Sequence, residues 1–241
     1  MSPPSPSHVT QERLTPPDFS LALLALASGS SDAISFLTLG KVFTSAMTGN
    51  TALLGIAVGQ GRIADALMGF SALMGFAIGV ATAAALSESR SVISLAHGLR
   101  PLFALEAAYL GCFALVWTLA PHPAKGGTVF ALIILSAAAM GIQSVAARRI
   151  NAPGISTIVF TSTLVSIITS ITGAVVRRAR PLVGFVTRRQ IGIFVSYMIG
   201  ATIAGFMLGH ELIWIVFLPL VSLIGAFACC EFDAHQQSKK P

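Results

Sequence analysis

Asp32 is the residue of this sequence most suited to do chemistry, because it lies within the apolar run LALLALASGSSDAISFLTLG. An ionised carboxylate deep in a bilayer is costly unless it faces protein, water or a cation, so it marks a candidate site. The preceding Ser28, Gly29, Ser30 and Ser31 are poor helix formers, which predicts a helix that bends or opens beside the carboxylate. Asp32, with Ser31 beside it, is therefore a candidate for binding a proton or a cation. The alternative is a carboxylate that hydrogen-bonds a neighbouring helix and only fixes packing.

A second polar interruption, Thr48, Gly49 and Asn50, lies in the apolar stretch VFTSAMTGNTALLG. Thr48 or Asn50 is placed to cap a helix starting near Thr51, which leaves the positive end of that helix pointing into the protein. Transporters hold anions in this way at broken helices. The corresponding stretch in the second half of the chain is Thr161, Ser162 and Thr163. We expect the two helix starts to face one cavity and contact substrate; the alternative is hydroxyls bonded to their own helix and an Asn that joins two helices.

Two further polar residues lie in apolar surroundings. Glu106 lies inside the membrane or near the headgroups, depending on whether its helix begins at Pro101. Gln143 is a candidate polar partner at the depth of Asp32, although a packing hydrogen bond also explains it. No P-loop, nucleotide-binding glycine motif, nucleophile elbow or metal-ligand spacing is present, so we expect no catalytic residue, no cofactor and no metal site.

The elements that must position these residues are membrane helices. The 241 residues are 54% hydrophobic and only 10% charged, whereas soluble domains carry about 25% charged residues. Mean hydropathy is +0.82, so the lipid bilayer is the first expected partner. The net charge of +6 is better explained by cytoplasmic loops and lipid headgroups than by a nucleic-acid partner. A small-molecule or ion substrate and a homo-oligomer are the other partners considered.

Apolar runs of membrane-spanning length recur along the chain, which predicts an all-α, polytopic transmembrane helix bundle of about seven or eight segments. A disordered polar tail over 1–18 precedes the transmembrane domain over 19–230, and a polar tail over 231–241 follows it. The predicted segments are 19–39, 42–60, 63–86, 101–120, 128–147, 155–176, 191–209 and 212–230.

The transmembrane domain resembles a repeat of two halves, 19–120 and 128–230, with discontinuous helices. AMGIQSV at 139–145 matches ASGSSDA at 27–33, and FTST at 160–163 matches MTGN at 47–50. Four spans in each half predict a parallel repeat, and an odd number predicts an inverted one. Chance recurrence of small residues is the alternative. Eight spans with a cytoplasmic amino terminus place ten Lys and Arg residues inside and five outside, so both termini are predicted to be cytoplasmic. Arg148 and Arg149 then face outward, although Lys and Arg are usually enriched in cytoplasmic segments.

The stretch GSSDAISFLTLGKVFTSAMTGNTALLG at 29–55 and the Thr-rich stretch GISTIVFTSTLV at 154–165 resemble the YoaK-like family of bacterial multi-pass membrane proteins. Relatives often carry Thr-Gly-Thr where this chain has Thr161, Ser162 and Thr163. The resemblance implies a bacterial cytoplasmic membrane protein and supplies no activity. From the residues, we expect a small proton- or cation-coupled secondary transporter rather than an enzyme. The alternatives are a channel and a non-transporting scaffold or accessory subunit.

Overall fold

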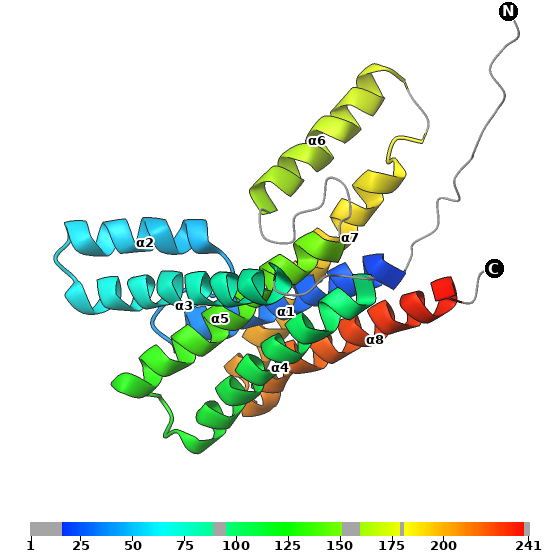
Figure 1. Cartoon of the computed structure of the whole chain (residues 1–241). Coiled ribbons are helices and arrows are strands. Elements are labelled where there is room, and N and C mark those ends of the chain that lie inside the picture. Colours follow the sequence, from blue (N-terminus) through cyan, green and yellow to red (C-terminus); the bar gives the residue numbers. More distant parts are fainter. Residues whose placement is uncertain (1–15, 89–94, 151–159, 179–180, 239–241) are drawn as a thin grey trace, which may run out of the picture.

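The computed structural model describes residues 16–88, 95–150, 160–178 and 181–238, and every regular element in these residues is a helix. The predicted all-α bundle is confirmed (Figure 1). Residues 1–15 of the predicted amino-terminal tail lie outside the described residues. The helices are α1 Pro16–Thr38, α2 Met47–Gly59, α3 Ile63–Glu88, α4 Leu95–Leu119, α5 Gly127–Ile150, α6 Phe160–Val176, α7 Phe185–Gly209, the short 3₁₀ helix η1 Ile213–Phe217, and α8 Leu218–Ser238.

Six of the eight α-helices in the described residues are long and apolar enough to cross a membrane: α1, α3, α4, α5, α7 and α8. The other two, α2 and α6, have 13 and 17 residues. At 1.5 Å per residue they reach about 20 and 25 Å, which is less than the roughly 30 Å of hydrocarbon. The predicted segment 42–60 is therefore a shorter helix than a full span requires, and of the predicted segment 155–176 residues 155–159 lie outside the described residues. The described part of the chain has three long helices in each half.

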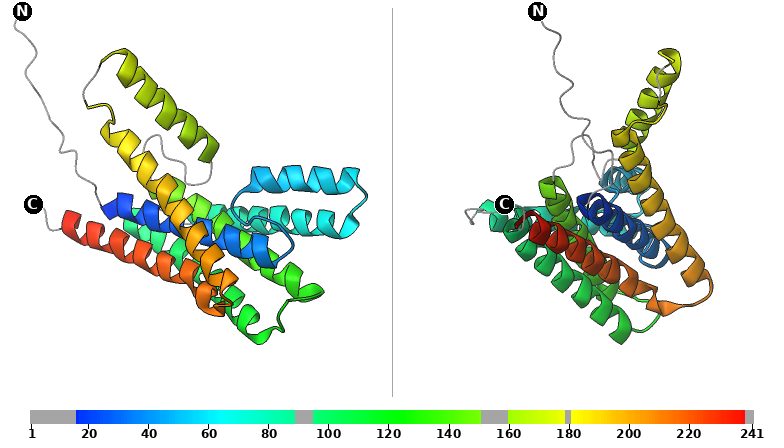
Figure 2. Two further views of the ribbon diagram at one scale, coloured as in Figure 1. Left: turned by 180° about the vertical axis from the view of Figure 1, so that it is seen from behind. Right: turned by 90° about the vertical axis from the view of Figure 1, so that its right-hand side faces the viewer.

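The two central helices are α1 and α5, which are 61% and 72% buried over their apolar windows, against 17% for α7. α1 packs on α7 and α8, while α5 packs on α3 and α4. The short helices lie at the periphery, α2 on α3 and α6 on α7 (Figures 1 and 2). α1, α4 and α7 run in one direction along the bundle, and α3, α5 and α8 run in the other (Figure 1). α1 begins and α8 ends at the same end of the bundle, which we call the termini end (Figures 1 and 2).

α1 and α7 cross at two glycines that permit close backbone approach. A Cβ atom on Gly29 would collide with the backbone carbonyl of Tyr197, and one on Gly200 would collide with the carbonyl of Leu26. Small residues let membrane helices gain van der Waals contact where lipid offers no hydrophobic drive. The serine and glycine stretch before Asp32 therefore serves a helix crossing.

α3 and α5 cross in the same manner. A Cβ atom on Gly79 would collide with the carbonyl of Ala138, and one on Gly141 would collide with the carbonyl of Phe76. Gly75, on the same face, would bring a Cβ to 2.8 Å from the carbonyl oxygen of Ile134. The two crossings thus use the same reciprocal contact between a glycine and a carbonyl.

The helix is interrupted at a different place from the predicted one. α1 is helical through Ser28–Ser31 and ends at Thr38, so the expected opening beside Asp32 is wrong. The Ser30 hydroxyl instead donates to the Leu26 and Ala27 carbonyls of its own helix, at 3.0 Å each. The break covers 39–46, where Gly40 and Lys41 have φ of 91° and 60°. Left-handed backbone at two successive residues turns the chain sharply.

The helix containing Glu106 begins at Leu95, earlier than the predicted start at Pro101, which lies inside it. Pro101 is the seventh residue of α4, so it removes one N–H group from the hydrogen-bond ladder, and the helix continues past it to Leu119. Glu106 is therefore residue 12 of 25, near the middle of α4, and it is fully buried. This position favours the intramembrane interpretation of Glu106 over the interfacial one. At the carboxyl end, α8 continues through Glu231 to Ser238.

Candidate functional site

Asp32 accepts hydrogen bonds from three residues and is only 2% exposed. The backbone N–H groups of Thr44 and Ser45 donate to its Oδ1, each at 2.7 Å. The hydroxyls of Ser45 and Tyr197 donate to its Oδ2 at 2.6 and 2.7 Å. Two carboxylate oxygens offer about four acceptor positions, so these four donors fill the set, and the Thr44 hydroxyl lies farther from Oδ1, at 3.4 Å.

Asn50 holds the same loop from its other side. Its Oδ1 accepts the backbone N–H of Phe43 at 2.8 Å, and its Nδ2 donates to the Phe43 carbonyl at 2.5 Å. Asn50 lies in the first turn of α2 and is fully buried. The N-cap of α2 is Ala46, which makes no side-chain cap, so the predicted capping by Thr48 or Asn50 is wrong. The break between α1 and α2 is thus fixed by a carboxylate on α1 and an amide on α2.

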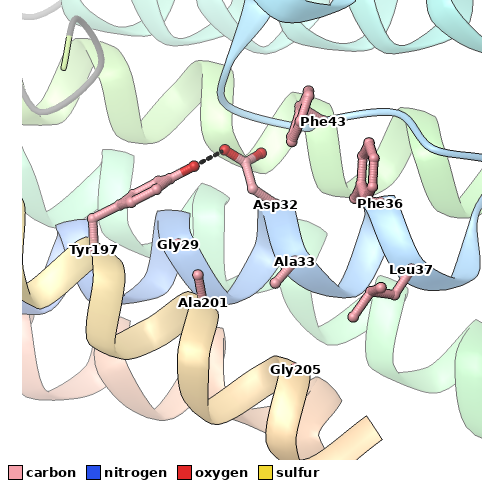
Figure 3. A pocket seen from close by; sticks show the side chains of 9 residues that line it. All are labelled: Gly29, Asp32, Ala33, Phe36, Leu37, Phe43, Tyr197, Ala201 and Gly205. Atoms are coloured by element: carbon pink, nitrogen blue, oxygen red, sulfur yellow. Dashed lines mark hydrogen bonds between the residues drawn. The ribbon is translucent and has the colours of Figure 1, made fainter. Parts of the chain in front are cut away.

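A cavity of about 290 Å³ lies against the Asp32 carboxylate, between α1 and α7. Tyr197 extends from α7 toward Asp32, and Phe43 approaches from the loop, so three separate segments meet at this cavity (Figure 3). Phe36 and Phe43 stack on each other with ring centroids 5.0 Å apart. The lining residues are Gly29, Asp32, Ala33, Phe36, Leu37, Phe43, Tyr197, Ala201 and Gly205.

The cavity occupies one half of the seam between α1 and α7. Its lining runs from Gly29 and Tyr197 toward Leu37 and Gly205, near the carboxyl ends of both helices. Leu37 is 58% exposed, so this part of the lining reaches the surface of the molecule. Of the nine lining residues, only Asp32 carries a formal charge, and no Lys, Arg or His is among them. The Asp32 charge therefore has hydrogen bonds but no opposite charge in the cavity.

The other half of the seam, toward the termini end, is closed. The glycine crossing of Gly29 and Gly200 leaves no space between the backbones. Beyond it, Arg189 in the second turn of α7 forms an ion pair with Asp18 in the first turn of α1, and both side chains are largely buried. The cavity thus ends at Asp32 and Tyr197 without a passage toward the termini end along this seam.

Gln143 and Glu106 are deep in the bundle but do not line the cavity. Gln143 Nε2 donates to the Leu24 carbonyl at 2.8 Å and to the Ser28 hydroxyl at 2.7 Å, which joins α5 to α1. The packing alternative for Gln143 is therefore confirmed, although its Oε1 has no partner among the described residues. Both carboxyl oxygens of Glu106 and the Ser31 hydroxyl are likewise buried without a hydrogen-bond partner in the described part of the chain.

The two predicted helix starts are not brought to one cavity. Thr48 is exposed, and Gly49 packs beside the ring of Phe43. Thr161 and Ser162 are exposed at the start of α6, and Thr163 is buried. The first turns of α2 and α6 lie on the same flank of the bundle, yet the two helices make no contact (Figures 1 and 2). None of these residues lines the cavity beside Asp32.

Three residues of the site were missed from the sequence, namely Tyr197, Thr44 and Ser45. Tyr197 is one of only two tyrosines and lies in the run IGIFVSYMIGATIAG. A tyrosine hydroxyl in an apolar interior needs a hydrogen-bond partner, so its presence in mid-span was a usable signal. Thr44 and Ser45 act mainly through backbone N–H groups, which no side-chain pattern reveals. The described residues contain no cluster of His, Cys, Asp and Glu arranged to hold a metal.

Comparison with known sequences finds one family, described as "Protein of unknown function (DUF1275)", whose pattern matches residues 20–229. The chain belongs to this family. A relative is the UPF0700 transmembrane protein YoaK of Bacillus subtilis (strain 168), which is 34% identical over 208 residues, or 85% of this chain and 90% of the relative. The expected YoaK-like membership is thereby confirmed, and so is a multi-pass membrane protein. No solved structure matches the chain.

Proposed function

We propose that this member of the DUF1275 family is a small secondary transporter whose substrate occupies the cavity between α1 and α7. One observation carries the proposal: a buried, hydrogen-bonded carboxylate lines a cavity beside a break between helices. Intramembrane carboxylates and discontinuous helices are the features from which transporters build binding sites. Asp32 supplies the charge, and the loop over 43–45 supplies the break.

The reciprocal glycine crossings support an inverted internal repeat, in which α1–α4 correspond to α5–α8. Gly29 and Gly141, on the two central helices, are 112 residues apart. Gly79 and Gly200, on the helices they meet, are 121 residues apart. The pairings of α1 with α7 and α8 match those of α5 with α3 and α4, and corresponding helices run in opposite directions (Figure 1). Three spans in each half favour inversion over the parallel alternative. Inverted repeats suit alternating access, because the two halves can exchange conformations.

Charge distribution supports termini that face the cytoplasm. With six spans, twelve of the fifteen Lys and Arg residues fall in segments at the termini end, and three fall at the opposite end: Lys41, Arg62 and Lys125. Cytoplasmic segments are enriched in these residues. Arg148 and Arg149, which faced outward when eight spans were counted, face the cytoplasm when six are counted. In this orientation the part of the cavity lining that reaches the surface faces the outside, and the Asp18–Arg189 ion pair lies on the cytoplasmic side.

A coupling ion, if a proton, is better carried by Glu106 than by Asp32. Asp32 is surrounded by four donors, an arrangement that suits the ionised carboxylate. Glu106 has no hydrogen-bond partner among the described residues and lies in an apolar core that includes Leu102, Phe103 and Leu110. An unpaired carboxyl in such a core is expected to be neutral, so we assign the coupling proton to Glu106.

The test is uptake of a panel of small solutes into proteoliposomes containing the purified protein. Uptake of a substrate is expected to saturate with concentration, and Ala201→Leu is expected to abolish this uptake because the added side chain fills the cavity. Thr202→Leu, next in sequence but exposed on α7, is the matched control and should transport normally. Conductance without saturation indicates a channel instead.

A structural role is the competing function, and the hydrogen bonds of Asp32 favour it. A carboxylate whose four acceptor positions are all used by its own chain resembles an anchor for a loop. A scaffold or accessory subunit predicts no uptake of any solute, together with stable copurification of a fixed partner. Wild-type uptake by Ala201→Leu would also remove the cavity from the transport proposal.

A further inference from the structure

From the chemistry of the cavity we infer that its ligand is a small organic cation without N–H donors, such as a quaternary ammonium. The inference rests on the transport proposal for the purpose of the site, but it concerns what the cavity binds, whether or not the ligand is moved. It follows from the charge, the acceptor positions and the aromatic rings at Asp32.

Charge gives the sign of the ligand. Asp32 is the one charged residue of the nine that line the cavity, and no ion pair of the described residues includes it. Hydrogen bonds satisfy its oxygen atoms but leave a net negative charge beside apolar walls. A fixed charge in low dielectric attracts an opposite charge more strongly than it would in water. An anion is repelled, and a neutral ligand gains nothing from the carboxylate.

The acceptor positions of Asp32 are all occupied, and this indicates which class of cation the cavity can bind. Four donors already occupy Asp32, so an ammonium with N–H groups has no free position to donate to without displacing Tyr197 or the loop. A metal ion needs several oxygen ligands, and the remaining lining side chains offer none apart from the Tyr197 hydroxyl. A cation that carries no donors, and needs only charge and apolar contact, avoids both difficulties.

Aromatic rings supply that contact. Phe36, Phe43 and Tyr197 all line the cavity, and they surround the Asp32 carboxylate on the loop side and the α7 side (Figure 3). Quaternary ammonium groups are held by aromatic rings together with a nearby negative charge. A volume of about 290 Å³ is at the lower limit of ligand pockets, which restricts the ligand to a small one.

The experiment measures binding of choline to the purified full-length protein in lipid nanodiscs by isothermal titration calorimetry. Its neutral isostere, 3,3-dimethylbutan-1-ol, has the same shape with carbon in place of the charged nitrogen. Choline is expected to bind at least about tenfold more tightly than the isostere, and Asp32→Asn is expected to remove that preference. Ala201→Leu should abolish choline binding, and Thr202→Leu should not. Equal affinity for choline and the isostere, or no choline binding by the wild-type protein, overturns the inference.

A second measurement tests the donor argument and does not depend on the charge change. Tyr197→Phe keeps a ring in place but frees one acceptor position on Asp32 Oδ2. Ethanolamine, the primary-ammonium analogue of choline, is expected to bind weakly to the wild-type protein and several-fold more tightly to Tyr197→Phe relative to choline. An unchanged ratio of the two affinities contradicts the role assigned to the filled acceptor positions.

Failure of this inference can be distinguished from failure of the transport proposal. If choline binds but proteoliposomes neither accumulate nor exchange it, the inferred cation site is supported and the transport proposal is contradicted. If a neutral or anionic solute is transported and Ala201→Leu blocks it, while choline does not bind, transport stands and the ligand class is overturned.

Discussion

The hydrogen bonds of Asp32 separate two effects that a single substitution usually mixes, namely loss of charge and loss of an acceptor. In Asp32→Ala the backbone N–H groups of Thr44 and Ser45 lose their acceptor, and both residues are almost fully buried. A buried donor without a partner costs about 1–3 kcal/mol, so the variant is expected to lose roughly 2–6 kcal/mol of unfolding free energy.

Asp32→Asn removes the charge but leaves one acceptor oxygen. That oxygen can take both backbone N–H groups, while the new NH₂ group faces the Ser45 and Tyr197 hydroxyls. Hydroxyls donate or accept by rotation, so both can reverse their bonds. Each bond weakens by about 1 kcal/mol when its acceptor becomes neutral, but the desolvation cost of a buried charge is also removed. We therefore expect this variant to lie within about 2 kcal/mol of the wild type.

The assay is SDS titration in mixed micelles for global stability, with hydrogen exchange over the loop 39–46 as the local measurement. Asp32→Ala should exchange faster at Thr44 and Ser45, while Asp32→Asn should retain most of the protection. If Asp32→Ala keeps the unfolding free energy and the hydrogen-exchange protection of the wild type, Asp32 does not hold the loop. If Asp32→Asn loses as much unfolding free energy as Asp32→Ala, the charge of Asp32, rather than an acceptor oxygen, holds the loop.

Three other predictions concern the rest of the bundle. Gly79→Ala is expected to lose about 1–3 kcal/mol in the same titration, because its Cβ meets the α5 backbone, whereas Gly192→Ala has open space and should lose nothing. Glu106→Met is expected to gain about 1–3 kcal/mol because it removes a buried carboxyl without partners; if protons couple transport through Glu106, uptake by this variant also loses its dependence on a pH gradient. In a background without the natural cysteines, an impermeant maleimide applied to intact cells is expected to label Glu211→Cys and not Arg178→Cys; the reverse pattern would invert the orientation.

The fold class followed from composition because long apolar runs have few alternatives to membrane helices. The number of spans could not be predicted from the sequence, because hydropathy reports whether a segment tolerates lipid and not where its helix ends. Residues 42–60 are apolar enough to read as a span, although the helix covers only Met47–Gly59. The stop depends on left-handed backbone at Gly40 and Lys41, and on the hydrogen bonds to Asp32 and Asn50, which join residues at least seven positions apart.

The candidate site was predictable only in part, for a related reason. Asp32 and Asn50 stood out because their side chains are expensive in lipid, and both hold the loop between α1 and α2. Tyr197, which is 165 positions from Asp32, reaches it only because α1 and α7 cross at Gly29 and Gly200. Spacing along the chain says nothing about such a contact. The stretch at Thr161 was favoured by its likeness to Thr48, yet neither stretch lines the cavity.

Loop position and ligand binding are linked through the Asp32 carboxylate, because the same two oxygens serve both. A cation bound as proposed would draw on the negative charge that the Thr44 and Ser45 N–H groups also use, and their hydrogen bonds would weaken as that charge is shared. The loop leads directly into α2 at Met47, which contacts the bundle through α3. Binding at the α1–α7 seam would therefore change the restraint on α2, which packs on α3, and α3 forms the second crossing with α5. In a bundle built on two corresponding crossings, this is the route by which a ligand at one crossing can affect the second.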